Sequence, residues 1–268
     1  MNNEKQDHVL FYLKNGLRYD GRKKEEYREI EVETGISKSA EGSARVKFGD
    51  TQVLAGVKFE IGKPYPDKQE EGTMMIMAEL LPLISSKFES GPPGIQAIEL
   101  ARVVDRGIRE SGAIDYKKLC IKPGELVWTI IVDILPINDA GNLFDTAALA
   151  AMLAIKNAKF PKLNGDKIDY KTHTKEKIPL IEEPVSITVL KIGEHFIVDP
   201  VPDEEEVLDA RLTVALTNDS VICAMQKGGE HPLSMDDIKT MIEIATKKSK
   251  ELRKHLGWEL KNEIYKIW

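Results

Sequence analysis

The sequence predicts an α/β (α+β) protein made of two β-α halves. In each half, short segments of alternating apolar and polar residues come first and a long helical pattern follows. A polar, lysine-rich segment separates the two patterns, and 268 residues are enough for one large domain or two smaller ones. The expected division is an N-terminal half with an N-terminal helix over residues 1–160, a linker over 161–184, and a C-terminal half with a long C-terminal helix over 185–268.

The first half opens with a helical pattern and continues with strands. Val9, Leu10 and Leu13 share one helical face, which predicts a short docked helix over residues 4–14. Alternating apolar residues then predict strands, and Gly49-Asp50 predicts a hairpin turn between two of them. The strands are expected at 28–32, 44–48, 51–59 and 73–81, with a proline-containing loop at 62–72.

Two helices and a buried strand complete the first half. After the break at 91–94, residues 95–110 have a helical pattern. The β-branched run at 125–135 is typical of a buried strand, and a turn at 138–141 follows it. An alanine-rich helix is expected at 143–158, in the core, because small side chains let the backbone pack closely.

The second half consists of two predicted hairpins and a long helix. The hairpins are expected at 185–198, around Gly193, and at 211–226, around Asn218-Asp219. Ser234 is a plausible helix N-cap, and Asp236 and Asp237 in the first turn suit the positive end of a helix. The basic residues at 253–255 before Gly257 predict the end of this helix.

Composition indicates a soluble cytoplasmic protein without a cofactor. No apolar run approaches the roughly 20 residues that span a bilayer, and the polar N-terminus does not fit a signal peptide. Cys120 and Cys223 lie in apolar surroundings and are expected to be buried free thiols. The five histidines lack metal-ligand spacing, and the common nucleotide-binding and nucleophile motifs are absent, so neither a metal nor a cofactor is expected.

The charge of the chain limits how it could bind nucleic acid. A net charge of −6 and a pI near 5.6 are unfavourable for a protein that grips RNA by itself, because neutralisation of phosphates drives such binding. Contact with RNA would therefore need a local basic patch or a more basic partner.

Three arginines lie on one side of the first long helix. Arg102, Arg106 and Arg109 fall within a wedge roughly 60° wide, opposite a set of apolar residues. Their guanidinium groups could donate paired hydrogen bonds to phosphates. Glu99 and Asp105 are also spaced for ordinary surface ion pairs, so the pattern alone favours a solvated face. The opposite, inward-facing residues are Ala97, Ala101, Val104 and Ile108.

Two groups of carboxylates invite interpretation as catalytic or metal-binding sites. Asp133, Asp139 and Asp145 flank a predicted strand end and helix start, where α/β sheets often bind ligands. Asp139 is nevertheless typical of a turn or a helix cap. The acidic run at 203–206 is expected to be a solvated turn, because consecutive side chains cannot converge on one ion without backbone ligands.

Four segments carry a resemblance to a known family. They are Leu17-Arg18-Tyr19-Asp20-Gly21-Arg22, the hairpin at 42–51, the helix segment at 98–106 and the turn Asp139-Ala140-Gly141-Asn142. In this order they resemble the opening motif, first hairpin, RNA-proximal helix and central-helix turn of the RNase PH family of phosphorolytic 3′→5′ exoribonucleases. The resemblance extends from about Gly16 to His255.

The resemblance implies a fold, partners and RNA contacts. The implied fold is RNase PH-like, with two β-α halves similar to ribosomal protein S5 domain 2. Within the family, the chain is most similar to the non-catalytic subunits of the archaeal exosome. Such a subunit alternates with a catalytic RNase PH-like partner in a hexameric ring, a trimer of heterodimers, under S1- or KH-type RNA-binding cap subunits.

The same resemblance implies which residues contact the RNA 3′ end. Arg102 and Arg106 match the positions for that role, whereas Arg109 is less certain and structural pairing is favoured for it. Lys63 and Lys68, in the loop after the second strand of the first hairpin, are weaker candidates for the RNA path, because loop lysines are usually only solvated.

Two departures from the catalytic members imply that this chain has no catalytic residues. Those members carry Gly-Ser/Thr-Arg before the central helix to hold phosphate, whereas this chain has Gly141-Asn142-Leu143. They also carry an aspartate where this chain has Arg211, which cannot give up its proton near neutral pH.

Two alternatives stay open at this point. The chain could itself be a phosphate-dependent exoribonuclease if a register shift brought Asp209 into the acid position. It could also be a separate RNA-binding module of related fold, although its acidic pI is unfavourable for that function.

Overall fold

The computed structural model describes residues 2–165 and 167–257 and confirms the expected mixed α/β architecture. In chain order its elements are α1 (Asn2–Lys14), β1 (Ile30–Thr34), β2 (Gly42–Phe48), β3 (Thr51–Gly62), β4 (Thr73–Ala78), α2 (Ile95–Glu110), β5 (Cys120–Lys122), β6 (Leu126–Asn138), α3 (Leu143–Asn157), β7 (Lys159–Asn164), β8 (Lys167–Lys177), β9 (Val185–Ile192), β10 (His195–Val198), α4 (Pro202–Glu205), β11 (Ala210–Leu216), β12 (Ile222–Gly228) and α5 (Met235–Lys254). A short 3-10 helix at Tyr116–Leu119 precedes β5.

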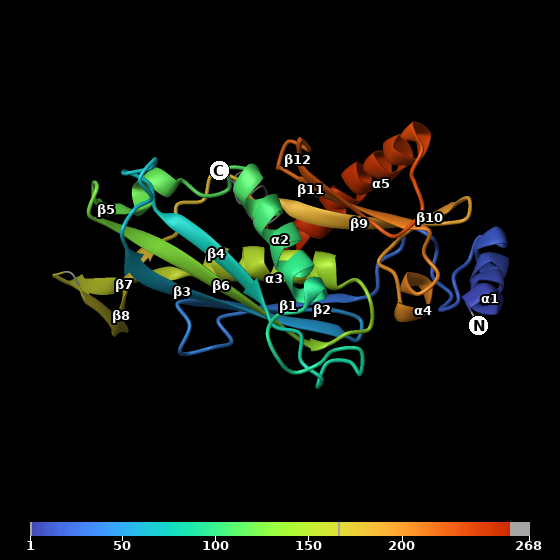
Figure 1. Cartoon of the computed structure of the whole chain (residues 1–268), viewed down its shortest axis with the longest axis horizontal. Coiled ribbons are helices and arrows are strands. Elements are labelled where there is room, and N and C mark those ends of the chain that lie inside the picture. The colour runs from blue at the N-terminus through green and yellow to red at the C-terminus, as the bar shows by residue number, and fades with distance from the viewer. Residues whose placement is uncertain (1, 166, 258–268) are drawn as a thin grey trace, which may run out of the picture.

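The strands form two main sheets with helices between and outside them (Figure 1). The first sheet has the order β1-β2-β3-β6-β4, and β5 pairs with β6. In it β4 runs parallel to β6 and the other pairs are antiparallel. The second sheet is antiparallel, with the order β10-β9-β11-β12. Helices α2 and α3 contact both sheets, and α5 packs on β9 and β11.

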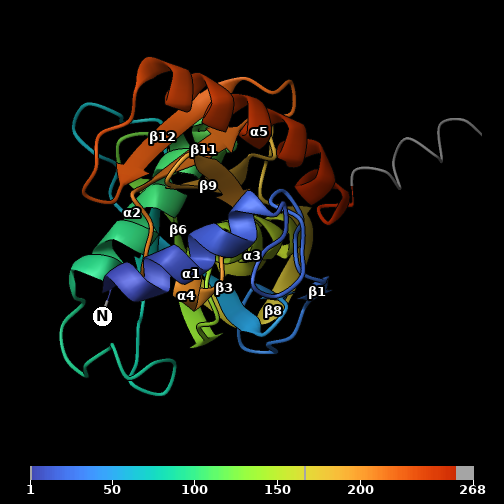
Figure 2. The same ribbon diagram turned by 90° about the vertical axis from the view of Figure 1, so that its right-hand side faces the viewer.

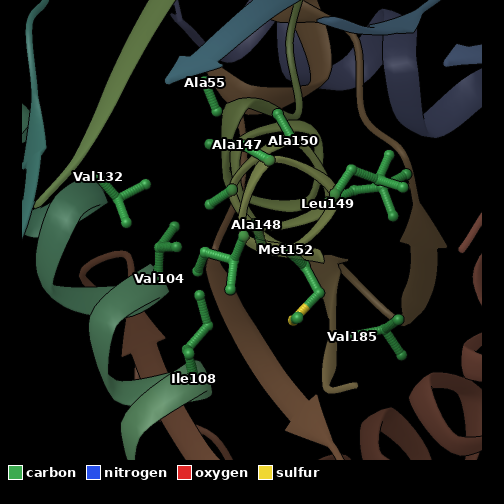
Figure 3. Close-up of a cluster of buried hydrophobic side chains, with 14 of the residues drawn as sticks. Ala55, Val104, Ile108, Val132, Ala147, Ala148, Leu149, Ala150, Met152 and Val185 are labelled. Atoms are coloured by element: carbon green, nitrogen blue, oxygen red, sulfur yellow. The ribbon is translucent and has the colours of Figure 1, made fainter. Parts of the chain in front are cut away.

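Helix α3 is the centre of a core that both halves share. All of its residues from Asp145 to Ile155 are buried, as its alanine-rich sequence predicts. Figure 3 shows Ala147, Met152 and their neighbours on this helix packed among side chains from α2, the first sheet and Val185 of the second sheet. One hydrophobic cluster therefore extends through the two halves.

The N-terminal helix forms as expected, but it docks on the second half. Val9 and Leu13 are buried against Leu190, Ile192 and Ile197 of β9 and β10. Figure 2 shows α1 crossing this end of the molecule near α4. The first segment of the chain thus contributes to the packing of the last sheet.

The segment expected to be a linker is largely a hairpin. Strands β7 and β8 pair over residues 159–177, and Phe160 anchors them by packing on Phe59 and Trp128, with ring centroids 4.7 and 5.5 Å away. Pro161 and the polar composition predicted a linker, but Asn164-Gly165 is a strong hairpin-turn signal. Residues 258–268 of the expected second half lie outside the described residues. None of the described helices is long and apolar enough to cross a membrane.

Candidate nucleic-acid interface

Helix α2 presents its arginines beside a surface cavity. It begins after the Gly-Pro break, and its apolar side is buried against α3 and both sheets, through Ala97, Leu100, Val103, Val104, Gly107 and Ile108. Arg102 and Arg106 line a cavity of about 390 Å³ between α2 and strands β11 and β12. Ser186, Thr213 and Gln226 supply polar groups to the same cavity. The site thus combines two guanidinium groups with neutral hydrogen-bonding side chains.

The three arginines differ in what they bind. Arg102 is exposed and has no ion pair or hydrogen bond with any residue that the structure describes. Arg106 forms an exposed ion pair with Glu110, one helical turn away. Such a pair is worth little in water, so a phosphate could replace Glu110 readily.

Arg109 is held by the protein itself. Its guanidinium donates to both Asp105 oxygens, at 2.7 and 3.0 Å, and to the backbone oxygen of Met74 at 2.8 Å. These bonds tie α2 to β4. Lys63 is exposed just after β3 and does not line the cavity of Arg102 and Arg106, and Lys68 pairs with Glu71 at 3.0 Å.

A second cavity brings together the residues of both sequence departures. Asn142, Leu143 and Arg211 line a space of about 280 Å³ between α3, α4 and β11. The turn before α3 needs glycine at position 141, where φ is +90° and an added Cβ would lie 2.3 Å from the backbone oxygen of Pro200. Asn142 also has a left-handed backbone, with φ of 59°.

Arg211 is fixed in this second cavity by charge and by stacking. Its guanidinium forms an ion pair with Glu99 of α2, and its Cζ lies 3.9 Å from the ring centroid of Phe144. Gly228 on the neighbouring strand leaves room for it, since an added Cβ there would lie 2.4 Å from the Arg211 Nε. Asp209 points elsewhere, because it accepts a 2.6 Å hydrogen bond from the Gly193 amide and does not line this cavity.

The N-cap residue of α3 binds a carboxyl group from the chain itself. The Asn142 amide donates to Oε1 of Glu205 at 2.9 Å. Burial raises the pKa of Glu205 to about 7, although the Asn142 hydrogen bond opposes this rise. The backbone amide of the N-cap residue, at the end of the helix that attracts anions, is thus already bonded to a carboxyl group.

The expectation that 203–206 is only a solvated turn is wrong for Glu204 and incomplete for Glu205. Glu204 is almost fully buried and accepts a 2.8 Å hydrogen bond from Nε of the equally buried Arg18. Asp203 and Glu206 are exposed, and both pair with Lys5. The ion pair with Arg18 compensates for the cost of burying the Glu204 charge. A carboxylate in a solvated turn would need no such partner.

The carboxylates considered from sequence do not converge. Asp133 is exposed on the first sheet, and Asp139 accepts a 3.1 Å hydrogen bond from the Gly141 amide, as a turn residue does. Asp145 is fully buried, and burial raises its pKa to about 7 against the opposing hydrogen bonds from Thr188 and Asn142. Among the described residues there is no group of three or more metal-ligating side chains.

Sequence reasoning missed the role of Asp199. This buried carboxylate accepts hydrogen bonds from Arg28 at 2.7 Å, Arg22 at 2.7 Å and Asn142 at 3.0 Å. Burial opposes ionisation, but the contacts with Arg28 and Asn142 lower the pKa of Asp199 below its ordinary value. Arg28 and Arg22, the second from the opening motif, therefore hold Asp199 beside the turn before α3, and no local pattern in the sequence pointed to this distant partner.

The two cysteines are free, as expected, but each is only partly buried.

Comparison with known proteins gives consistent matches over the whole fold. Residues 26–161 match domain 1 of the 3′ exoribonuclease (RNase PH) family, and residues 182–248 match domain 2. A Methanopyrus kandleri protein called exosome complex component Rrp42 is 43% identical over 260 residues, which is 96% of this chain and 97% of that protein. The protein of the same name from Thermococcus gammatolerans is 46% identical, with 93% of each chain covered. A chain of a solved Archaeoglobus fulgidus exosome with RNA bound to the active site is 42% identical, with a TM-score of 0.88 over 95% of this chain and 98% of that one.

Proposed function

Because this chain belongs to the 3′ exoribonuclease (RNase PH) family, we propose that it is a non-catalytic subunit of an archaeal-type exosome. In this proposal it works in the cytoplasm and alternates with a catalytic RNase PH-like partner in a hexameric ring. S1- or KH-type cap subunits complete the assembly. The names of the relatives and the RNA-bound solved structure support this assignment.

The observation that carries the non-catalytic role is the hydrogen bond from Asn142 to Glu205. Phosphorolysis needs an inorganic phosphate at the turn before the central helix, and here a carboxylate fills that helix N-terminus. An ionised Glu205 would repel phosphate, and Leu143 supplies no positive charge to hold it. Arg211 in the same cavity cannot serve as a general acid, and its guanidinium is already paired with Glu99.

The proposed contribution of the chain is to bind RNA at the active site of its neighbour. Arg102 and Arg106 suit this role, because they share one cavity and neither is committed to a buried internal partner. Arg109 is assigned to structural pairing, since Asp105 and Met74 engage its guanidinium. Lys63 stays a weaker candidate because it lies outside this cavity.

Purification of the chain with and without a candidate catalytic partner tests the proposal. Labelled RNA and phosphate are added, and assembly mass and release of nucleoside diphosphates are measured together. We expect a hexameric mass and phosphorolysis only for the mixture. Release of nucleoside diphosphates by the chain alone would contradict the non-catalytic role.

The variant Arg211→Asp, purified alone, is the matched control for this test. It restores a carboxylate at the family position, but Glu205 and Leu143 still prevent phosphate binding, so we expect no activity. Activity in this variant would show that the phosphate site has been placed wrongly.

A further inference from the structure

The β7–β8 hairpin is a strongly basic element in an acidic chain. Residues 159–177 contain six lysines and three carboxylates, a net charge of +3, whereas the whole chain carries −6. The hairpin is a separate two-stranded sheet at the end of the molecule opposite α1 (Figure 1). It shares no residue with the cavity lined by Arg102 and Arg106.

The lysines of the hairpin are exposed, and two of them, Lys162 and Lys171, lie near a carboxylate of the hairpin, Asp169, whose pKa they help to lower. None of them forms an ion pair with any residue that the structure describes, and each side chain lies in solvent. Lys159 and Lys177 are cross-strand partners, an arrangement that costs stability because like charges face each other. The isolated chain gains nothing from this pairing, whereas a bound anion would relieve the repulsion. The six are Lys159, Lys162, Lys167, Lys171, Lys175 and Lys177.

The base of the hairpin is nevertheless firmly attached to the first sheet. Phe160 packs on Phe59 and Trp128, and the Tyr170 hydroxyl donates to the Phe59 oxygen at 3.2 Å. The Lys58 amine lies 4.6 Å from the centroid of the half-exposed Tyr170 ring. The lysines are therefore carried on an element whose position is set by packing, and an aromatic ring lies beside them; Lys58 itself is paired with the buried Glu41 at 2.9 Å.

We propose that the β7–β8 hairpin is a second RNA-binding surface, which contacts phosphates of the strand upstream of the 3′ end. This inference rests on the proposed function, because it takes the substrate to be RNA held by its 3′ end elsewhere on the ring. Exposed lysines next to an accessible aromatic ring are typical of surfaces that bind single strands. The centres of protein–protein interfaces, by contrast, are depleted in lysine, so RNA fits this surface better than a protein partner does.

The test compares short and long RNA on the reconstituted complex with its catalytic partner. The variant carries Lys167→Gln, Lys171→Gln and Lys175→Gln, which remove charge without touching the anchoring aromatic residues. We expect its affinity for a single strand of about 30 nucleotides to fall about tenfold, with affinity for about 8 nucleotides unchanged. The salt dependence of log K for the long strand should weaken by about 2, for three lost phosphate contacts.

The matched control removes three exposed lysines elsewhere, by Lys38→Gln, Lys117→Gln and Lys250→Gln, and should leave both affinities unchanged. Unchanged binding of the long strand by the hairpin variant would overturn the proposal, as would an equal loss for both lengths. Loss of the partner subunit from the complex, with unaltered RNA affinity, would instead identify a protein contact and overturn the proposal. The pair Arg102→Glu and Arg106→Glu should weaken both lengths; if it does not, the proposed function fails regardless of the hairpin result.

Discussion

Arg211 links the helix that carries the proposed RNA-binding arginines to the second sheet. Its ion pair reaches Glu99, three residues before Arg102, while its guanidinium stacks on Phe144 at the start of α3. The side chain is mostly buried, at 16% exposure, so both contacts are stronger than they would be at the surface. The residue that replaces the acid in our proposal thus also positions α2.

We expect Arg211→Met to lower the free energy of unfolding by about 1–2 kcal/mol, because it leaves Glu99 unpaired and removes the cation from the Phe144 ring. Urea denaturation followed by circular dichroism measures this. The matched control is Arg106→Met, whose pair with Glu110 is about half exposed on both sides and should be worth less than about 0.5 kcal/mol. Equal effects of the two substitutions would show that Arg211 does not have this structural role.

Asp145 makes the stability of the protein depend on pH in an unusual direction. Burial raises its folded-state pKa to about 7, well above the ordinary aspartate value. Between about pH 4 and pH 7 the folded chain therefore binds more protons than the unfolded chain, so this group's contribution to stability is lost as pH rises through that window.

The variant Asp145→Asn has no proton to lose at this position and should be insensitive to this effect. We expect its stability relative to the unmodified chain to increase from pH 5 to pH 8, by on the order of 2 kcal/mol. Thermal unfolding of both proteins at several pH values measures the difference. A difference that is constant with pH would contradict the raised pKa; Glu205→Gln serves as a comparison, because Glu205 also has a pKa of about 7.

At the scale of elements, the long periodic segments were predictable and the irregular ones were not. Residues 95–110 and the α3 segment form helices within a residue of their predicted bounds, because an apolar face at helical spacing is a local signal. The burial of Glu204 was not predictable, since its partner Arg18 lies 186 residues away in the sequence. The hydrogen bond between Asn142 and Glu205 was not predictable for the same reason, because only the folded chain brings these two residues together.

One side of helix α2 has a structural role through Arg109 and a proposed RNA-binding role through Arg102 and Arg106, and substitutions should separate the two. Arg109→Met removes the bonds to Asp105 and Met74 and should lower stability by about 1 kcal/mol, while RNA degradation by the mixed complex is retained. The pair Arg102→Glu and Arg106→Glu should have the reverse effect, with assembly intact and degradation weakened. Urea denaturation, assembly mass and degradation rate are measured for each. If Arg109→Met abolished degradation in a stable complex, Arg109 would belong with the RNA contacts.

At the scale of the whole molecule, the acidic charge predicts that RNA binding is a property of the assembly. A chain with a net charge of −6 repels phosphates at long range, and its two proposed basic surfaces are local. We expect the isolated chain to bind single-stranded RNA at least tenfold more weakly than the mixed ring at the same salt concentration, because only the ring joins these surfaces to those of a partner. The two arginines of the cavity should account for about 1.4 of the slope of log K against log salt, so Arg102→Gln with Arg106→Gln should reduce the slope for the ring by that amount. Fluorescence anisotropy from about 50 to 200 mM salt measures both quantities. An isolated chain that binds as tightly as the ring would instead indicate a self-sufficient RNA-binding module.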